Sequence, residues 1–76
     1  MIRLNLKTLM ARYDVSQEAL AKECGVSSRL ISEWANNRKW PQRKNISEIL
    51  KALRKLGMPE VVEAFPIAVK DLIIES

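Results

Sequence analysis

The sequence contains no histidine, one cysteine and only two glycines among its 76 residues. Without histidine it lacks the usual general base and the commonest metal ligand. Gly25 and Gly57 cannot form a glycine-rich loop for a phosphate, and no GxSxG or CxxC pattern is present. These absences argue against an enzyme, so we expect no catalytic residues, no metal ion and no cofactor.

The scarcity of cysteine and of long apolar runs bears on the compartment. Cys24 cannot form an internal disulfide, which fits a reducing cytoplasm. No apolar run approaches the ~20 residues that a membrane-spanning helix needs. Charged and apolar residues alternate after Met1, unlike a signal peptide. We therefore expect a cytoplasmic protein with no membrane association.

The length of 76 residues predicts one small domain covering residues 1–76. A chain of this size buries only roughly 60% of its unfolded surface, so its core is marginal and an oligomer would help to stabilise it. The hydrophobic fraction of 47% and charged fraction of 29% are ordinary for a folded domain. Disorder is therefore not expected.

Residues 16–38, SQEALAKECGVSSRLISEWANNR, contain two short amphipathic helix patterns separated by a glycine. The spacing puts seven apolar residues on one inner side of the pair: Ala19, Leu20, Cys24, Val26, Leu30, Ile31 and Trp34. The outer face of the second pattern carries Ser28, Arg29, Ser32 and Glu33. A supporting helix, a tight turn and a helix with one polar face form the arrangement that enters the major groove of DNA.

Basic side chains are concentrated in the middle of the chain. Residues 29–55 contain eight lysines and arginines and two glutamates, a net charge of +6. The preceding residues carry a net charge of +1, and residues 56–76 carry −3. Such a distribution suits a polyanion bound on one side only. Charges that merely keep a protein in solution are the alternative, but this block overlaps the helix-turn-helix pattern.

Start and stop signals predict five helices. Asn5 is expected to cap the first helix, whose apolar side carries Leu6, Leu9, Met10 and Tyr13. Ser16 and Ser27 are expected to cap the second and the third helix. Gly25 ends the second helix, and Asn36 and Asn37 tolerate the left-handed backbone that often follows a helix. Asn45 with Glu48 resembles a capping box for the fourth, which ends at Gly57. Pro59 begins the fifth, with inner residues Val61, Val62 and Phe65.

These residues resemble the helix-turn-helix domain shared by phage repressors and Cro proteins, the XRE family. The resemblance covers about residues 5–65 and rests on Gln17, Ala21, Gly25, Val26, Ser27, Ile31, Ser32, Trp34 and Pro41. It implies an all-α, five-helix lambda-repressor-like fold in a prokaryotic or phage-infected cell. Ala35 stands where glutamate is usual and Asn37 where glycine is usual, which leaves the course of the following loop open.

The resemblance also implies roles for the polar residues. Base contacts would come from Ser28, Arg29, Ser32 and Glu33. Phosphate contacts would come from Gln17, which would also brace residue 28, and from Ser27, Asn36, Arg38, Lys39, Arg43 and Lys44. The chemistry agrees, because arginine donates twice to guanine and glutamate accepts from cytosine. Glu33 could instead orient Arg29, four residues earlier on the helix.

Residues 66–76 carry more apolar surface than a free terminus should show: Ile67, Val69, Leu72, Ile73 and Ile74. They must fold back on the domain or meet a second copy, and we expect them to form the dimer interface. Residues 72–74 fit either a strand or a helical turn. Ile2 and Leu4 alternate with Arg3, so short extended termini that pair with each other are a further alternative.

The function expected from these features is sequence-specific binding of double-stranded DNA by a transcriptional regulator. One probe helix reads only ~3–5 base pairs, which favours a Cro-like repressor acting as a homodimer on a two-fold operator. An antitoxin or a restriction-modification controller fits the same fold, with a toxin or RNA polymerase as protein partner. A scaffold that binds another protein through its apolar tail is an alternative of another class, but the net charge of +6 over residues 29–55 argues against it.

Overall fold

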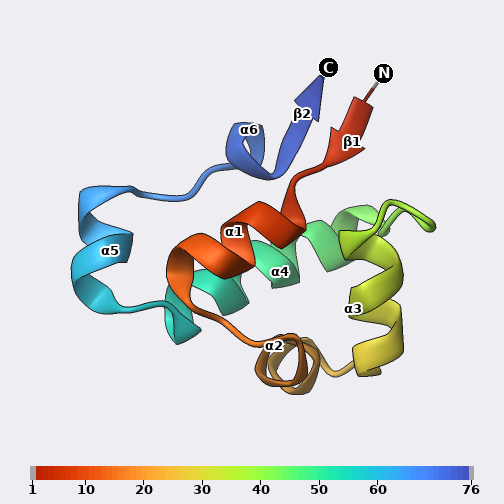
Figure 1. The fold of residues 1–76 in the computed structure, drawn as a ribbon, viewed down its shortest axis with the longest axis horizontal. Helices are drawn as coiled ribbons and strands as arrows, with labels where there is room; N and C mark the ends of the chain where they lie inside the picture. The colour runs from red at the N-terminus through yellow and green to blue at the C-terminus, as the bar shows by residue number, and fades with distance from the viewer. Residues whose placement is uncertain (1, 76) are drawn as a thin grey trace.

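The computed structural model describes residues 2–75, which form six helices and one two-stranded sheet. In chain order the elements are β1 (Ile2–Leu4), α1 (Leu6–Tyr13), α2 (Gln17–Cys24), α3 (Ser28–Ala35), α4 (Arg43–Leu56), α5 (Pro59–Ala64), α6 (Val69–Leu72) and β2 (Ile73–Glu75). Figure 1 shows α1 and α4 in the middle, α2 below them, α3 at the right-hand side, and the two strands at the top, where the termini meet. The predicted lambda-repressor-like helical fold is confirmed, with a sixth helix and a terminal sheet added.

The two helices of the predicted DNA-binding motif begin where the sequence indicates. Ser16 and Ser27 are extended, and their hydroxyl oxygens accept hydrogen bonds from the amides of Ala19 and Leu30, each at 3.1 Å. Each bond satisfies an amide that has no partner inside its helix. Gly25 has a φ of +70°, a left-handed conformation that glycine adopts without strain. The α2–turn–α3 unit is therefore specified by its local sequence.

One predicted side-chain cap and one predicted helix start are wrong. Asn5 precedes α1, but its side chain does not cap that helix. The side-chain amide of Asn5 instead donates to the Asp71 carbonyl at 3.3 Å. The α4 helix begins at Arg43, earlier than Asn45, because Gln42 is the residue in the extended cap conformation. The side-chain oxygen of Asn45 accepts from the backbone amide of Gln42 at 3.3 Å, so Asn45 takes part in the cap as the third residue of the helix.

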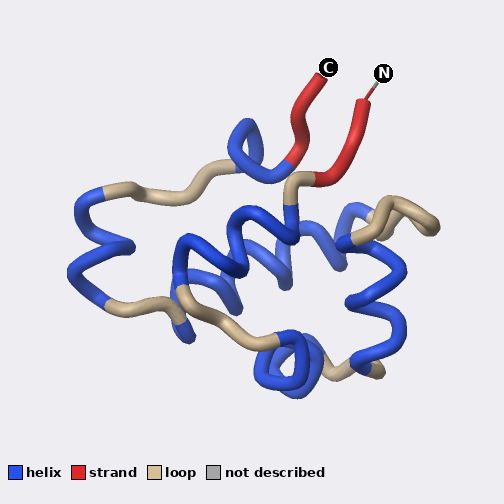
Figure 2. Tube along the Cα trace, viewed as in Figure 1, coloured by secondary structure: helices blue, strands red, loops and turns tan. Residues whose placement is uncertain are grey.

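The C-terminal segment belongs partly to the core. Ile67 is 4% exposed and Leu72 is fully buried, so these two side chains fold back on the domain. The strands pair antiparallel, with Leu4 opposite Ile73 and Ile2 opposite Glu75. Figure 2 shows this pair beside the short α6 turn. The predicted alternative of extended, paired termini is therefore confirmed, and the tail is no free appendage.

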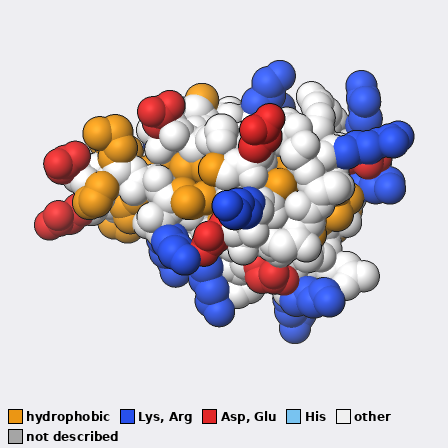
Figure 3. Space-filling view, turned by 90° about the horizontal axis from the view of Figure 1, so that it is seen from below, with side chains coloured by type: hydrophobic (Ala, Val, Ile, Leu, Met, Phe, Trp, Pro, Cys, Tyr) orange, Lys and Arg blue, Asp and Glu red, His pale blue; other side chains and the backbone are white. Residues whose placement is uncertain are grey.

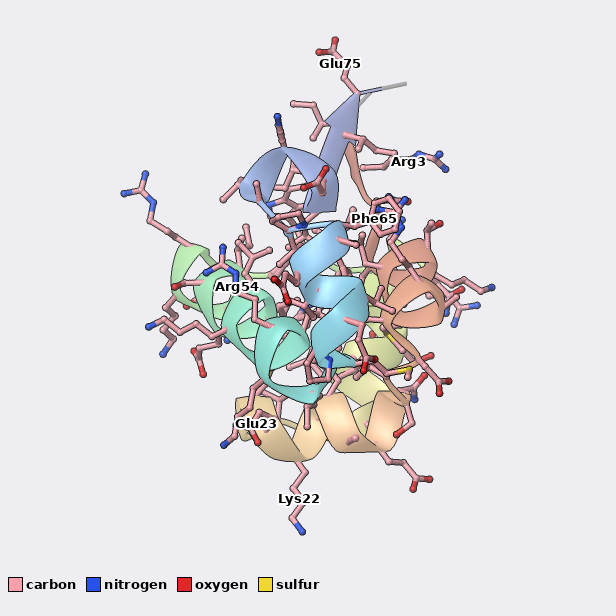
Figure 4. The ribbon with its side chains drawn as sticks, turned by 90° about the vertical axis from the view of Figure 1, so that its left-hand side faces the viewer. Arg3, Lys22, Glu23, Arg54, Phe65 and Glu75 are labelled. Atoms are coloured by element: carbon pink, nitrogen blue, oxygen red, sulfur yellow. The ribbon has the colours of Figure 1, made fainter. Side chains whose placement is uncertain are left out.

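The predicted burial of Phe65 is wrong, since its side chain is 61% exposed. The α5 helix ends at Ala64, so Phe65 no longer shares the inner face of Val61 and Val62. The backbone is held instead, because the Tyr13 hydroxyl donates to the Phe65 carbonyl. Arg54 on α4, labelled in Figure 4, fixes the next segment by donating to the Ile67 carbonyl at 2.9 Å.

Cys24 is buried as predicted, and its thiol should be unreactive. Burial raises its pKa from an ordinary 9.0 to about 11, and the carboxylates of Glu48 and Glu23 add to the rise. We expect the folded chain to react with a disulfide reagent near pH 8 at least about a hundredfold more slowly than the chain in concentrated denaturant, because the thiolate is the reactive species. Similar rates in the two conditions would contradict this assignment.

The same pKa shift has a consequence for stability. A pKa raised in the folded state means that folding favours the neutral thiol. The contribution of Cys24 to stability is therefore complete below its unfolded pKa, near 9.0, and is lost as the pH rises through about 11.

Candidate DNA interface

The α3 helix has a buried side and an outer polar side. Ile31 and Trp34 anchor it in the core, whereas Arg29 is exposed and Ser28, Ser32 and Glu33 are partly exposed. The four predicted base-contact residues thus lie on one short helix, away from its anchors. Serine side chains are short, so such a face can approach base edges closely while the longer arginine and glutamate reach them.

Gln17 holds the start of α3 in place. Its side-chain amide donates to the Ser28 carbonyl at 2.8 Å, which confirms the predicted brace between α2 and residue 28. A primary amide has two N–H donors. One is used for this brace, so the second can donate to a phosphate without loss of the first bond.

Asn36 turns back onto the outer side of α3. Its side-chain amide donates to the Ser32 carbonyl at 2.8 Å and to the Ser32 hydroxyl at 3.4 Å. The Arg38 amide donates to the Glu33 carbonyl at 2.8 Å, which closes the helix end. Asn36 therefore lies beside Ser32, a predicted base contact. The backbone of Arg38 is held to the end of α3 by its bond to Glu33.

Asn37 explains the departure from the usual family glycine. Its φ of +58° lies in the left-handed region that asparagine tolerates better than most residues. Its side chain also bonds to both backbone groups of Leu4, accepting from the amide at 2.6 Å and donating to the carbonyl at 3.1 Å. The sequence predicted the left-handed backbone but gave no signal for a partner 33 positions away.

The ion pair of Glu33 differs from the predicted one with Arg29. Glu33 pairs with Lys39 at 3.7 Å, and within residues 2–75 it forms no ion pair with Arg29. An exposed pair of this kind contributes at most about 1 kcal/mol, so Lys39 can leave Glu33 for a phosphate. Lys55 pairs with Glu23 at 2.7 Å and so joins α4 to α2, where it is no part of the α3 surface.

Charge is separated along the molecule. Figure 3 shows lysine and arginine side chains at the end formed by α3 and its following loop and over the middle of this face, whereas the α5 end carries hydrophobic and acidic side chains. Arg38, Lys39, Arg43 and Lys44 are all exposed on the segment after α3. The predicted phosphate contacts thus continue from the end of α3 into the first turn of α4, and their field favours a polyanion at this end.

An open apolar groove of about 810 Å³ lies between the start of α4 and the C-terminal segment, lined by Trp40, Pro41, Gln42, Arg43, Ile46, Ser47, Leu50, Val69 and Ile73. Trp40 is 49% exposed and Val69 is 53% exposed. Ile74 on β2 is half-buried. Of the five apolar tail residues, Ile67 and Leu72 are in the chain's own core, so only Val69, Ile73 and Ile74 present surface to a partner.

A family model described as helix-turn-helix matches residues 6–60. The chain belongs to the XRE helix-turn-helix family. Domains of this family bind DNA sequence-specifically and are typically non-catalytic. Searches of curated proteins and of solved structures found no match to the chain. Among the described residues, no helix is both long and apolar enough to cross a membrane.

Proposed function

We propose that this XRE-family domain is a transcriptional repressor that binds a two-fold operator as a homodimer, with α3 in the major groove. The observation that carries the proposal is the geometry of α3. Its outer side presents Arg29 and Glu33 beside Ser28 and Ser32, while Ile31 and Trp34 fix the other side in the core. A polar helix face held rigidly by a neighbouring helix is what base reading requires.

Base reading is assigned to the outer residues of α3. Arg29 is exposed near the start of the helix, and its guanidinium can donate twice to O6 and N7 of guanine. Glu33 can accept from cytosine N4 one turn later. Ser28 and Ser32 allow the helix backbone to approach the bases.

Phosphate contacts are assigned to the two ends of α3. Ser27 caps its beginning, where the Gln17 side chain from α2 is bonded to Ser28, and Asn36, Arg38 and Lys39 follow its end. Arg43 and Lys44 extend this set into α4. Contacts on both sides of the probe helix would fix its register on the duplex, while the bases supply the specificity.

The salt dependence of binding tests the phosphate contacts. Replacing Arg38 or Arg43 by alanine should weaken binding to all duplexes and lower the slope of log affinity against log salt by about one per lost contact. Lys55→Ala is a matched control, because it removes the same charge from a side chain paired with Glu23. Slopes equal to that of the wild type in both arginine variants would show that neither side chain touches the DNA backbone.

The dimer interface is assigned to the apolar groove. Val69 and Ile73 from the tail and Trp40 from the loop after α3 line it together, so a second copy related by two-fold symmetry would cover the same surface on both chains. The groove follows directly on the exit of α3, so in such a dimer the symmetry axis would lie near the ends of the two probe helices. An antitoxin or a restriction-modification controller would use the same DNA surface and differ in its protein partner.

Binding to matched duplexes tests the proposal as a whole. Fluorescence anisotropy at one fixed salt concentration should show the full chain binding a selected operator at least ~10³-fold more tightly than a scrambled duplex of equal length. The complex should contain two chains per operator. Equal affinity for the two duplexes would contradict sequence-specific repression.

A further inference from the structure

The Asn37 side chain occupies the outer edge of β1. It accepts from the Leu4 amide at 2.6 Å and donates to the Leu4 carbonyl at 3.1 Å. A primary amide offers one acceptor and a donor side by side, as a peptide group of a neighbouring strand does. Asn37 therefore satisfies both backbone groups of Leu4 and covers a strand edge that would otherwise be open.

The same residue lies in the middle of the loop that carries the proposed phosphate contacts. On one side, Asn36 is hydrogen-bonded to Ser32. On the other side, the Arg38 amide is bonded to the Glu33 carbonyl. These bonds tie the loop to α3, whereas Asn37 is the residue that ties it to the terminal strand β1.

The terminal strand is itself firmly held. Leu4 is buried in the core and lies opposite Ile73 on β2. The backbone amide of Asn5 donates to the Leu72 carbonyl at 2.6 Å. Figure 4 labels Arg3 and Glu75 on these paired strands, at the end of the domain opposite Lys22 and Glu23 on α2. The strand pair thus gives the loop a rigid attachment point that α3 alone does not supply.

We infer that Asn37 is a positioning residue for DNA binding, which fixes the loop of Asn36, Arg38 and Lys39 by anchoring it to Leu4. It acts through the loop and touches no DNA. The inference rests on the proposed DNA-binding function of this loop. It also gives the terminal strands a role in DNA affinity, although they carry none of the proposed contacts.

Asn37→Gly isolates the contribution of the side chain, because glycine accepts the φ of +58° without strain. If the released loop holds its binding geometry about a tenth of the time, DNA affinity falls roughly tenfold. The loss should be equal on selected and random duplexes, since the loop contacts phosphates. Amide hydrogen exchange at Leu4 should become faster. Binding is measured at a temperature where circular dichroism shows both proteins fully folded.

Asn5→Gly is the matched control. It also removes an asparagine side chain bonded to a backbone carbonyl of the terminal region, at Asp71, but leaves the loop after α3 untouched. Its DNA affinity should stay within about twofold of the wild type, because the bond of the Asn5 backbone amide to Leu72 remains.

The outcomes separate this inference from the proposed function. Wild-type chain that binds no duplex refutes the proposed function, and the positioning role with it, before any variant is made. Wild-type binding together with unchanged affinity of Asn37→Gly overturns the positioning role alone. Unchanged hydrogen exchange at Leu4 overturns the anchor itself.

A second variant covers the case in which Asn37→Gly unfolds. Asn37→Asp retains the left-handed preference and the bond from the Leu4 amide, but cannot donate to the Leu4 carbonyl. Repulsion between its added charge and DNA fades as salt is raised, whereas the loss from a loop held to Leu4 by one bond in place of two persists. Affinity equal to that of the wild type at raised salt overturns the inference.

Discussion

Replacing Arg29 by alanine is expected to relax the preference at one base pair of the operator, a G·C pair, and to weaken operator binding by about 1–3 kcal/mol. The physical reason is its exposed position on the outer side of α3, away from the buried Ile31 and Trp34. Binding to random duplexes should change much less, because Arg29 is assigned to a base and not to a phosphate. Anisotropy titrations with the operator, its single-base variants and a random duplex measure this difference.

Arg12→Ala is the matched control for this experiment. Arg12 is an exposed arginine in the last turn of α1, so its removal changes the net charge equally without altering α3. It should leave the preference at every operator position unchanged. Equal losses of Arg29→Ala on operator and random DNA would instead identify Arg29 as a phosphate contact.

Replacing Val69 by glutamate is expected to convert the proposed dimer to a monomer and to weaken operator binding at least about a hundredfold, because two linked half-site contacts become one. Val69 is exposed on the wall of the apolar groove, where the proposed dimer would remove a carboxylate from water. It is the first residue of α6, so an acidic side chain there is compatible with the helix. Analytical ultracentrifugation gives the mass, and anisotropy gives the operator affinity.

Phe65→Glu controls for the general effect of placing a charge on an exposed apolar site. Phe65 is exposed but does not line the groove. This variant should keep the mass and the operator affinity of the wild type. A Val69→Glu chain that still sediments as a dimer would place the interface on another surface.

The structural elements that sequence could predict are those specified by nearby residues. Ser16 and Ser27 cap their helices through amides only three positions away, and Gly25 supplies the turn between them. The polar side of α3 followed from helical spacing alone. The start of α4 was misplaced because two polar residues, Gln42 and Asn45, share its cap and only the latter has the usual residue type.

Long-range contacts could not be predicted in the same way. The bonds of Asn37 to Leu4 depend on the folded positions of segments 33 residues apart. The sequence shows that the tail is apolar, but not which of its side chains are buried. The single turn of α6 directs Leu72 into the core and leaves Val69 exposed. Local periodicity cannot fix such a division in so short a helix.

Selection of binding sites from a pool of random duplexes by residues 1–76 tests the central assignment most directly. If α3 reads bases in a two-fold dimer, the retained pool should converge on two inverted half-sites whose centres lie ~10 base pairs, or a multiple of that, apart. A pool that is retained at the same salt concentration without converging on any common sequence would contradict base reading by α3.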